Sequence, residues 1–269
     1  MNKLVIIVCL FLVSSFLEAK SLFEEYKTTI IQSNNQDVII ADSPDFVVGA
    51  SGIVTHRFDE KASSIIAQVT VVSKSNGKAA LHVEKFTMLT QGAFPDTKIT
   101  PQVGDEVTIN YLYNRALIVT PNQETYTAVT KEYNTMTWIH PDIAAAYLTK
   151  IYRPNPDKAI FQTLCHQNSA SIIFFAVKNN GYFVDCNNFN TIKTIAINEN
   201  NATQQVPFYS RITNIESTWF SWDSATVVDY NNYYEYLLGQ TDTLKGQGLD
   251  GIIVKLPFTI VEKKDTLWK

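Results

Sequence analysis

Residues 100–122, "TPQVGDEVTINYLYNRALIVTPN", contain two runs with the composition of β-strands. From Val107 onward, apolar side chains take every second position, which is the period of a strand with one buried face. The second run is the apolar "ALIVTP". Asn114 and Arg115 stand between the runs, so we predict a hairpin that turns at these two residues.

The sequence before this stretch has the same character. From residue 37 it is dense in Val, Ile and Thr, with glycine, proline and asparagine turns between the runs. "AQVTVVSKSNGKAALHVE" is typical of a hairpin, because Asn76-Gly77 favours the positive φ angles of a tight turn. About six short strands of this kind suggest a small barrel or sandwich. We predict a β-rich domain at residues 37–135, after a polar lead-in at residues 20–36.

Helical patterns begin near Pro141. "HPDIAAAYLTKIY" and "NPDKAIFQTLCHQN" each carry a proline early, where a helix tolerates it. "TVVDYNNYYEYLLG" predicts a third helix that ends at Gly239.

Two strands are expected in "SASIIFFAVKNNGYFVDCNN", joined at Asn179-Asn180-Gly181, and a last strand in "DGIIVKLPFTIVEKK". The predicted fold class is therefore α+β. An N-terminal β-rich barrel or sandwich precedes a mixed α/β unit at residues 136–269, which has a short exposed C-terminal tail.

The first residues, "MNKLVIIVCLFLVSSFLEAK", indicate export. The apolar run from Leu4 to Val13 has the length of a signal-peptide core and is too short to span a bilayer. We predict a signal peptide at residues 1–19, cleaved after Ala19; an uncleaved anchor is the alternative. We expect no transmembrane span in the mature chain and a location at the bacterial cell surface or in the periplasm.

Composition excludes one class of partner. The formal net charge is −4, and basic residues are scattered, so a nucleic-acid binder driven by general charge is excluded. Hydrophobic residues make up 45% of the chain and charged residues 18%, which is typical of a folded protein. We expect a protein partner.

Two cysteines, Cys165 and Cys186, follow the predicted signal peptide. An even number of cysteines in an oxidising compartment allows one disulfide, and we predict that these two are bonded. Two buried free thiols are the alternative. Their spacing matches neither a CxxC redox motif nor a zinc site.

The sequence offers little catalytic chemistry. Cys165 and His166 are adjacent, but neighbouring side chains diverge on a strand or a helix, so adjacency does not make a nucleophile pair. "GASG" around Ser51 lacks the spacing of a nucleophile elbow. No phosphate-binding or metal motif is present. We expect no enzyme, cofactor or metal, although a hydrolase with a site assembled from distant residues stays open.

"ENNAT" contains the sequon Asn201-Ala202-Thr203, with Glu199 two residues before the asparagine. A sequon in a polar stretch can accept a glycan. We predict that Asn201 lies on an exposed loop and is a glycosylation site in a host with the required enzymes.

Several of these stretches together resemble a known family. "GASGIVTHRFD", "GDEVTINYLYNRALIVTPN" and "FQTLCHQN" followed by "YFVDCNNF" are similar to the N-terminal domain of the plasminogen-binding surface proteins of Helicobacter and Campylobacter relatives. The similarity runs from about Asp37 to Phe189. Family members typically carry a long charged C-terminal extension, whereas this chain continues for about 80 residues beyond Phe189 that have the pattern of a folded segment.

The resemblance implies capture of host plasminogen and directs attention to "DTLWK" at residues 265–269. Kringle modules of the host protein hold a lysine ammonium against paired acids and its stem against aromatic rings. A terminal lysine adds a carboxylate that a cationic group can engage. We therefore predict Lys269 as the principal plasminogen contact, with Trp268 stacking beside it or folding back onto the protein.

Two functions follow. The first is an exported, non-enzymatic protein of the cell surface or periplasm that binds host plasminogen. The alternative is a periplasmic scaffold or assembly factor that binds other envelope proteins.

Overall fold

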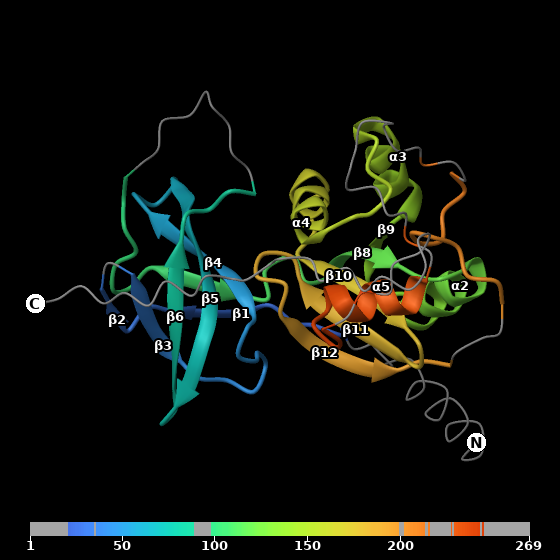
Figure 1. Cartoon of the computed structure of the whole chain (residues 1–269). Helices are drawn as coiled ribbons and strands as arrows, with labels where there is room; N and C mark the ends of the chain where they lie inside the picture. Colours follow the sequence, from blue (N-terminus) through green and yellow to red (C-terminus); the bar gives the residue numbers. More distant parts are fainter. Residues whose placement is uncertain are drawn as a thin grey trace, which may run out of the picture.

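The computed structural model describes residues 21–34, 36–88, 98–198, 202–212, 215, 227, 229–242 and 244. Two β-sheets stand side by side, and the helices gather around the second sheet (Figure 1). The predicted fold class, β-rich α+β, is confirmed.

The first sheet is antiparallel and has seven strands in the order β1-β7-β4-β5-β6-β3-β2. Its strands are β1 (Tyr26–Thr29), β2 (Gln32–Ser33), β3 (Asp37–Ala41), β4 (Ser51–Arg57), β5 (Ser63–Ser75), β6 (Lys78–Glu84) and β7 (Glu106–Ile109). The hairpin between β5 and β6 is confirmed, with Asn76 and Gly77 at φ angles of 50° and 72°.

One continuous segment curls this sheet into a half-barrel. β1 pairs with β7 and β2 pairs with β3, so consecutive residues form both edges. The segment passes from one edge of the sheet to the other at Ile30. The Ile30 N–H donates to the Asp105 carbonyl at 3.0 Å, and the Ile31 N–H donates to the Ile39 carbonyl at 2.8 Å. The first sheet therefore includes strands from the segment predicted as a lead-in. The residues of β1 and β2 are mostly polar and are exposed or partly exposed, so the sequence did not indicate these strands.

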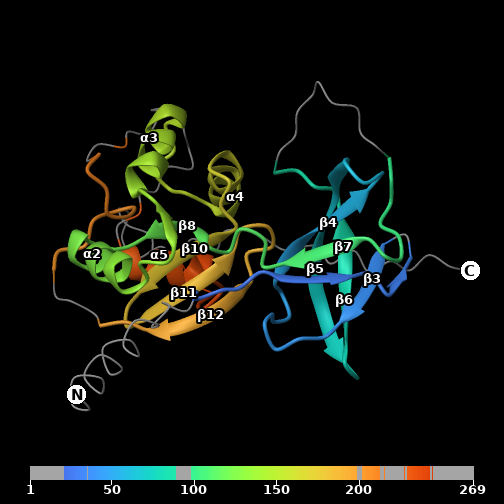
Figure 2. The ribbon, with the colours of Figure 1, turned by 180° about the vertical axis from the view of Figure 1, so that it is seen from behind.

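The second sheet has five strands in the order β12-β11-β10-β8-β9. They are β8 (Arg115–Val119), β9 (Thr137–Ile139), β10 (Ile172–Val177), β11 (Asn180–Asp185) and β12 (Thr191–Ala196). β8 is parallel to both β9 and β10, whereas β11 and β12 continue the sheet antiparallel (Figure 2).

Helices cover both faces of the second sheet. They are α2 (Gln123–Glu132), α3 (Pro141–Ile151), α4 (Lys158–Gln167) and α5 (Tyr230–Leu237). Alternate residues of β8 enter two cores: Ile118 packs with α2 and the first sheet, and Leu117 packs with α3, α4 and α5. The core that contains Ile118 is thus shared by both sheets. The helices predicted at Pro141, at residues 155–168 and before Gly239 are confirmed.

The hairpin predicted at Asn114-Arg115 is wrong, because β7 and β8 belong to different sheets. Asn110 and Leu112 have φ angles of 59° and 58°, and this kinked segment leads the chain out of the first sheet. β8 is buried from Ala116 to Val119 and lies between two parallel partners, which explains its unbroken apolar run.

The predicted limit of the β-rich domain at residue 135 stays a prediction. The first sheet ends at Ile109, and β8 and α2 lie with the second sheet. The sequence patterns did not reveal α2, whose N-cap is Asn122: the Asn122 side chain accepts from the Thr125 N–H at 2.9 Å. The last strand predicted, in "DGIIVKLPFTIVEKK", lies outside the described residues.

The β10–β11 hairpin is confirmed, but its turn residues are Lys178 and Asn179. Gly181 has a different role, since a Cβ there would lie 2.6 Å from the Phe174 ring. The helices in the described ranges have at most 11 residues, so none of them could cross a bilayer.

Candidate functional site

The residues predicted to contact a partner fall outside what the structure describes. These residues are Lys269 and Trp268, and the predicted glycosylation site Asn201 and the predicted signal peptide also lie outside the described residues. Their roles stay predictions.

The structure contains the disulfide that the cysteine count predicted. Cys165 on α4 and Cys186, directly after β11, are joined with an S–S distance of 2.05 Å and a Cα–Cα distance of 6.2 Å. Both residues are buried, so the bond fixes α4 to the end of β11 inside the second core. Cys165 consequently has no free thiol to pair with His166.

Replacing Cys165 and Cys186 together by alanine is expected to lower the free energy of unfolding by about 3 kcal/mol, because the bond closes a loop over a sequence separation of 21 residues. Chemical denaturation of the variant and of the parent chain without reductant measures this. Adding reductant should lower the stability of the parent alone. Equal unfolding midpoints for variant and parent would show that the bond contributes nothing.

A buried polar cluster joins the two sheets. Asp185, at the end of β11, accepts hydrogen bonds on Oδ2 from the Ser51 hydroxyl at 2.5 Å and from the Tyr113 hydroxyl at 2.6 Å. Tyr113 in turn accepts from the Ser51 N–H at 2.8 Å. Ser51 begins β4 and Tyr113 lies in the connection between the sheets, so three distant parts of the chain meet at one carboxylate.

The loop after β11 completes this cluster. The Asn187 and Asn188 N–H groups donate to Asp185 Oδ1 at 2.8 and 3.1 Å. Their side chains reach the first sheet: Asn187 Nδ2 donates to Ser51 Oγ at 2.9 Å, and Asn188 Nδ2 donates to the Gly49 carbonyl at 2.8 Å. We call the group of Ser51, Tyr113, Asp185, Asn187 and Asn188 the junction cluster.

Burial governs the electrostatics of the junction cluster. It raises the pKa of Asp185, although hydrogen bonds from Ser51 and Tyr113 oppose that rise. The pKa of Tyr113 lies well above its ordinary value, because of burial first and the Asp185 charge second. The Ser51 hydroxyl donates to the Asp185 carboxylate, and the residue is only 3% exposed. The cluster therefore holds the sheets together.

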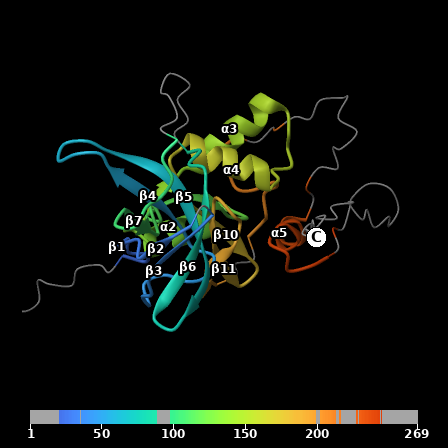
Figure 3. The same ribbon diagram turned by 90° about the vertical axis from the view of Figure 1, so that its left-hand side faces the viewer.

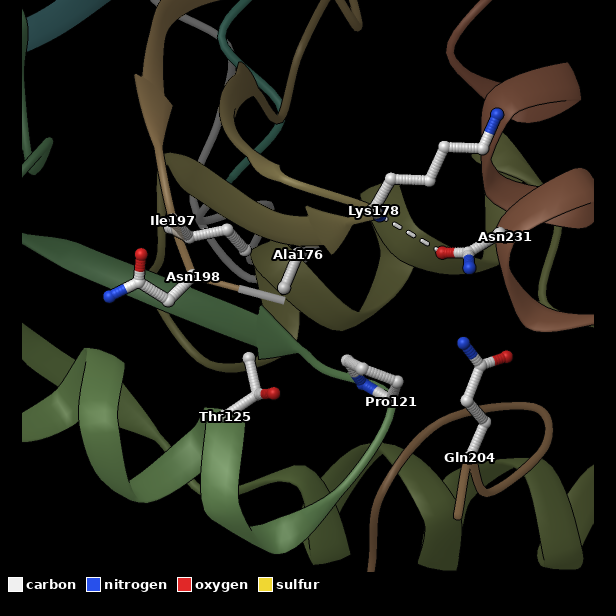
Figure 4. A pocket seen from close by; sticks show the side chains of 8 residues that line it. All are labelled: Pro121, Thr125, Ala176, Lys178, Ile197, Asn198, Gln204 and Asn231. Atoms are coloured by element: carbon white, nitrogen blue, oxygen red, sulfur yellow. Dashed lines mark hydrogen bonds between the residues drawn. The ribbon is translucent and has the colours of Figure 1, made fainter. Parts of the chain in front are cut away.

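A shallow hollow lies at the carboxyl ends of β8 and β10, where open α/β sheets commonly bind ligands (Figure 4). It has about 260 Å³ of empty space, part of it open solvent, which is below the usual range for small-molecule sites. The amides of Asn198, Gln204 and Asn231 contribute to its lining. Lys178 turns away to pair with Glu235, so none of the described residues that line the hollow directs a charge into it.

The histidines do not assemble a metal or catalytic site within the described ranges. His56 pairs with Asp105 at 2.8 Å and His82 with Asp37 at 3.1 Å. His140 caps α3 by accepting from the Asp142 N–H at 3.2 Å. In the same ranges, no three or more His, Cys, Asp or Glu residues gather in a way that could hold a metal ion.

The family comparison agrees with the extent of this fold. The family model described as "Plasminogen-binding protein pgbA N-terminal" matches residues 25–238. The match begins just before β1 and ends just after α5, so it includes both sheets, the junction cluster and the disulfide. The chain belongs to this family.

Two curated relatives of the PgbA N-terminal family are similar to this chain. They are the plasminogen-binding protein PgbA of Helicobacter pylori strain J99 and that of strain 26695, each 21% identical over 197 residues. The aligned region covers 72% of this chain and 43% of each relative. The chain thus spans less than half the length of the curated relatives that it matches.

Proposed function

We propose that this chain is an exported, non-enzymatic protein of the bacterial cell surface that binds host plasminogen. The observation that supports this is the match of the PgbA N-terminal family to residues 25–238. The relatives that are named for plasminogen binding are longer proteins. The region that they share with this chain makes up 43% of each. For this chain we propose that the shared fold and the residues that follow it are sufficient for plasminogen binding.

The disulfide supports export. Disulfides persist in oxidising compartments and are rare in the cytosol. Cys165 and Cys186 lie in one buried core, where a bond between them is protected from exchange. This agrees with a signal peptide at residues 1–19 and with a location where a host protein can be met.

Within this proposal, Lys269 is the principal contact. Where Lys269 carries a free carboxylate, a single residue presents an ammonium and a carboxylate together. A lysine-binding module that has both acidic and cationic groups can engage both charges, and charge-assisted hydrogen bonds are the strong ones at an interface. Trp268 adds a planar apolar surface beside them.

Deleting Lys269 is expected to weaken plasminogen capture at least tenfold, because it removes about 1.4 kcal/mol or more of interaction. Trimming with a basic carboxypeptidase should do the same, and a free lysine analogue should compete with the intact chain. Lys269→Arg serves as the control, since it retains both charges but presents a planar guanidinium. Undiminished capture by the truncated chain would remove Lys269 from the proposal.

A pull-down from host plasma and from envelope extract separates this function from the alternative. Recovery of plasminogen from plasma supports the proposal. The alternative, a periplasmic scaffold, predicts two other results. The pull-down should recover envelope proteins alone, and protease applied to intact cells should leave the chain undigested.

A further inference from the structure

The β4–β5 hairpin extends beyond the sheet that carries it. β7 pairs with β4 only as far as Thr55, and β6 pairs with β5 only from Gln68 onward. Between these limits His56 pairs with Ser64 and Arg57 with Ser63, with no further strand beside them in the described part of the sheet. Figure 3 shows this two-stranded ribbon projecting away from the rest of the fold.

The end of the ribbon is held in one conformation. Asp59 Oδ1 accepts from the Lys61 N–H at 2.7 Å and from the Ala62 N–H at 2.8 Å. The Phe58 N–H donates to the Ala62 carbonyl at 2.9 Å. The ribbon continues two strands of the sheet, and the contact of His56 Nδ1 with Asp105 Oδ1 at 2.8 Å links its base to the residue before β7. The tip is therefore ordered before any partner arrives.

The tip presents two opposite charges and an aromatic ring to solvent. The Phe58 side chain is 48% exposed, and Glu60 and Lys61 are exposed. Neither the Glu60 carboxylate nor the Lys61 ammonium has a side-chain partner among the described residues. Glu60 and Lys61 therefore place one anionic and one cationic side chain, both exposed, on the same turn.

Other lysines are less available for insertion into a partner. Lys74 pairs with Asp42 at 2.8 Å, and Lys178 pairs with Glu235. Lys158 lies over the Phe189 ring at 5.1 Å, and Lys193 lies 6.0 Å from the Phe23 ring. Lysines 27, 78, 131 and 150 lie within strands or helices. Lys61 lies in a turn that projects from the molecule.

We infer that the β4–β5 tip, through Lys61 with Glu60 and Phe58 beside it, is an internal lysine contact for the same partner. This rests on the proposed function. A site built for a lysine ammonium and a carboxylate meets both charges on the tip, and Phe58 can add contact with an aromatic wall. Because the turn is already ordered, binding loses little conformational entropy there. The tip and Lys269 would then be separate contacts, which strengthens binding when both engage.

The test measures plasminogen affinity for the parent chain, for Lys61→Ala, Lys78→Ala and Glu60→Gln, and for a form lacking Lys269 with and without Lys61→Ala. Lys78 is the matched control, since it is an exposed lysine beside the turn of the β5–β6 hairpin with glycine and alanine as neighbours. Lys61→Ala is expected to raise Kd about tenfold, and Lys78→Ala to change it less than about twofold. Lys61→Ala should lower the affinity by a similar factor in the form without Lys269. Glu60→Gln should also weaken binding, and thermal unfolding should be unchanged in every variant.

The outcomes separate the two proposals. A parent chain that binds and a Lys61→Ala variant that binds equally well would overturn the tip contact and leave the proposed function standing. Equal losses for Lys61→Ala and Lys78→Ala would also overturn it, because they would indicate a general charge effect. A parent chain without measurable affinity would overturn both.

Discussion

Replacing Asp185 by alanine is expected to lower the free energy of unfolding by about 3 to 5 kcal/mol, because several buried donors lose their acceptor and each unsatisfied group costs about 1–3 kcal/mol. The substitution leaves the Ser51 and Tyr113 hydroxyls and the Asn187 and Asn188 N–H groups without their acceptor. Asp185 has no exposed surface, so water cannot readily replace the carboxylate. Because domains are stable by only about 5–15 kcal/mol, this loss is a large fraction of the total.

Denaturant titration followed by far-ultraviolet circular dichroism measures the change. Asp185→Asn is the matched control: its carbonyl still accepts, and the Ser51 and Tyr113 oxygens can accept from its amide. A smaller loss of about 1 to 2 kcal/mol is expected for this control. An alanine variant within about 1 kcal/mol of the parent, the value of one ordinary hydrogen bond, would mean that the junction cluster does not hold the sheets together.

Replacing Gly52 by alanine is expected to destabilise the protein by about 4 kcal/mol or more, or to prevent folding, since overpacking against backbone has no cheap relaxation. A Cβ at this position would lie 2.4 Å from the Thr108 carbonyl oxygen and 2.9 Å from Ile109 Cα. β4 lies between β5 and β7, so moving it away from β7 would disturb the pairing on its other side.

Gly77→Ala provides the comparison. Gly77 has a φ angle of 72°, and a Cβ added there would have nothing within 4 Å, so only backbone strain opposes the substitution. A loss of about 1 to 2 kcal/mol is expected for Gly77→Ala. The yield of folded protein and the midpoint of thermal unfolding measure both variants. If the two substitutions had the same effect, the close approach of β4 to β7 would not be what requires Gly52.

Local patterns predicted the elements that are stabilised locally. α3 begins at Pro141, and α4 has Asp157 as its N-cap, so the sequence carries signals where each helix starts. The turn at Asn76-Gly77 likewise depends on its own two residues. The pairing of β8 was predicted wrongly because an apolar run indicates that a strand is buried but not which partners flank it, and its parallel neighbours come from residues 137–139 and 172–175.

The junction cluster could not be predicted from local patterns. Ser51 and Asp185 are 134 residues apart, and no spacing rule connects a serine after a glycine turn with an aspartate at the end of a strand. The burial of Asp185 depends on how the two sheets meet, which is a tertiary property. The β4–β5 tip is a similar case, since its projection follows from where β6 and β7 stop pairing.

Equilibrium binding of purified plasminogen to the full-length, disulfide-bonded chain tests the central claim most directly. We predict saturable binding that a free lysine analogue displaces and that survives at physiological salt. Absence of saturable binding, or binding that the lysine analogue leaves unchanged, would contradict the claim.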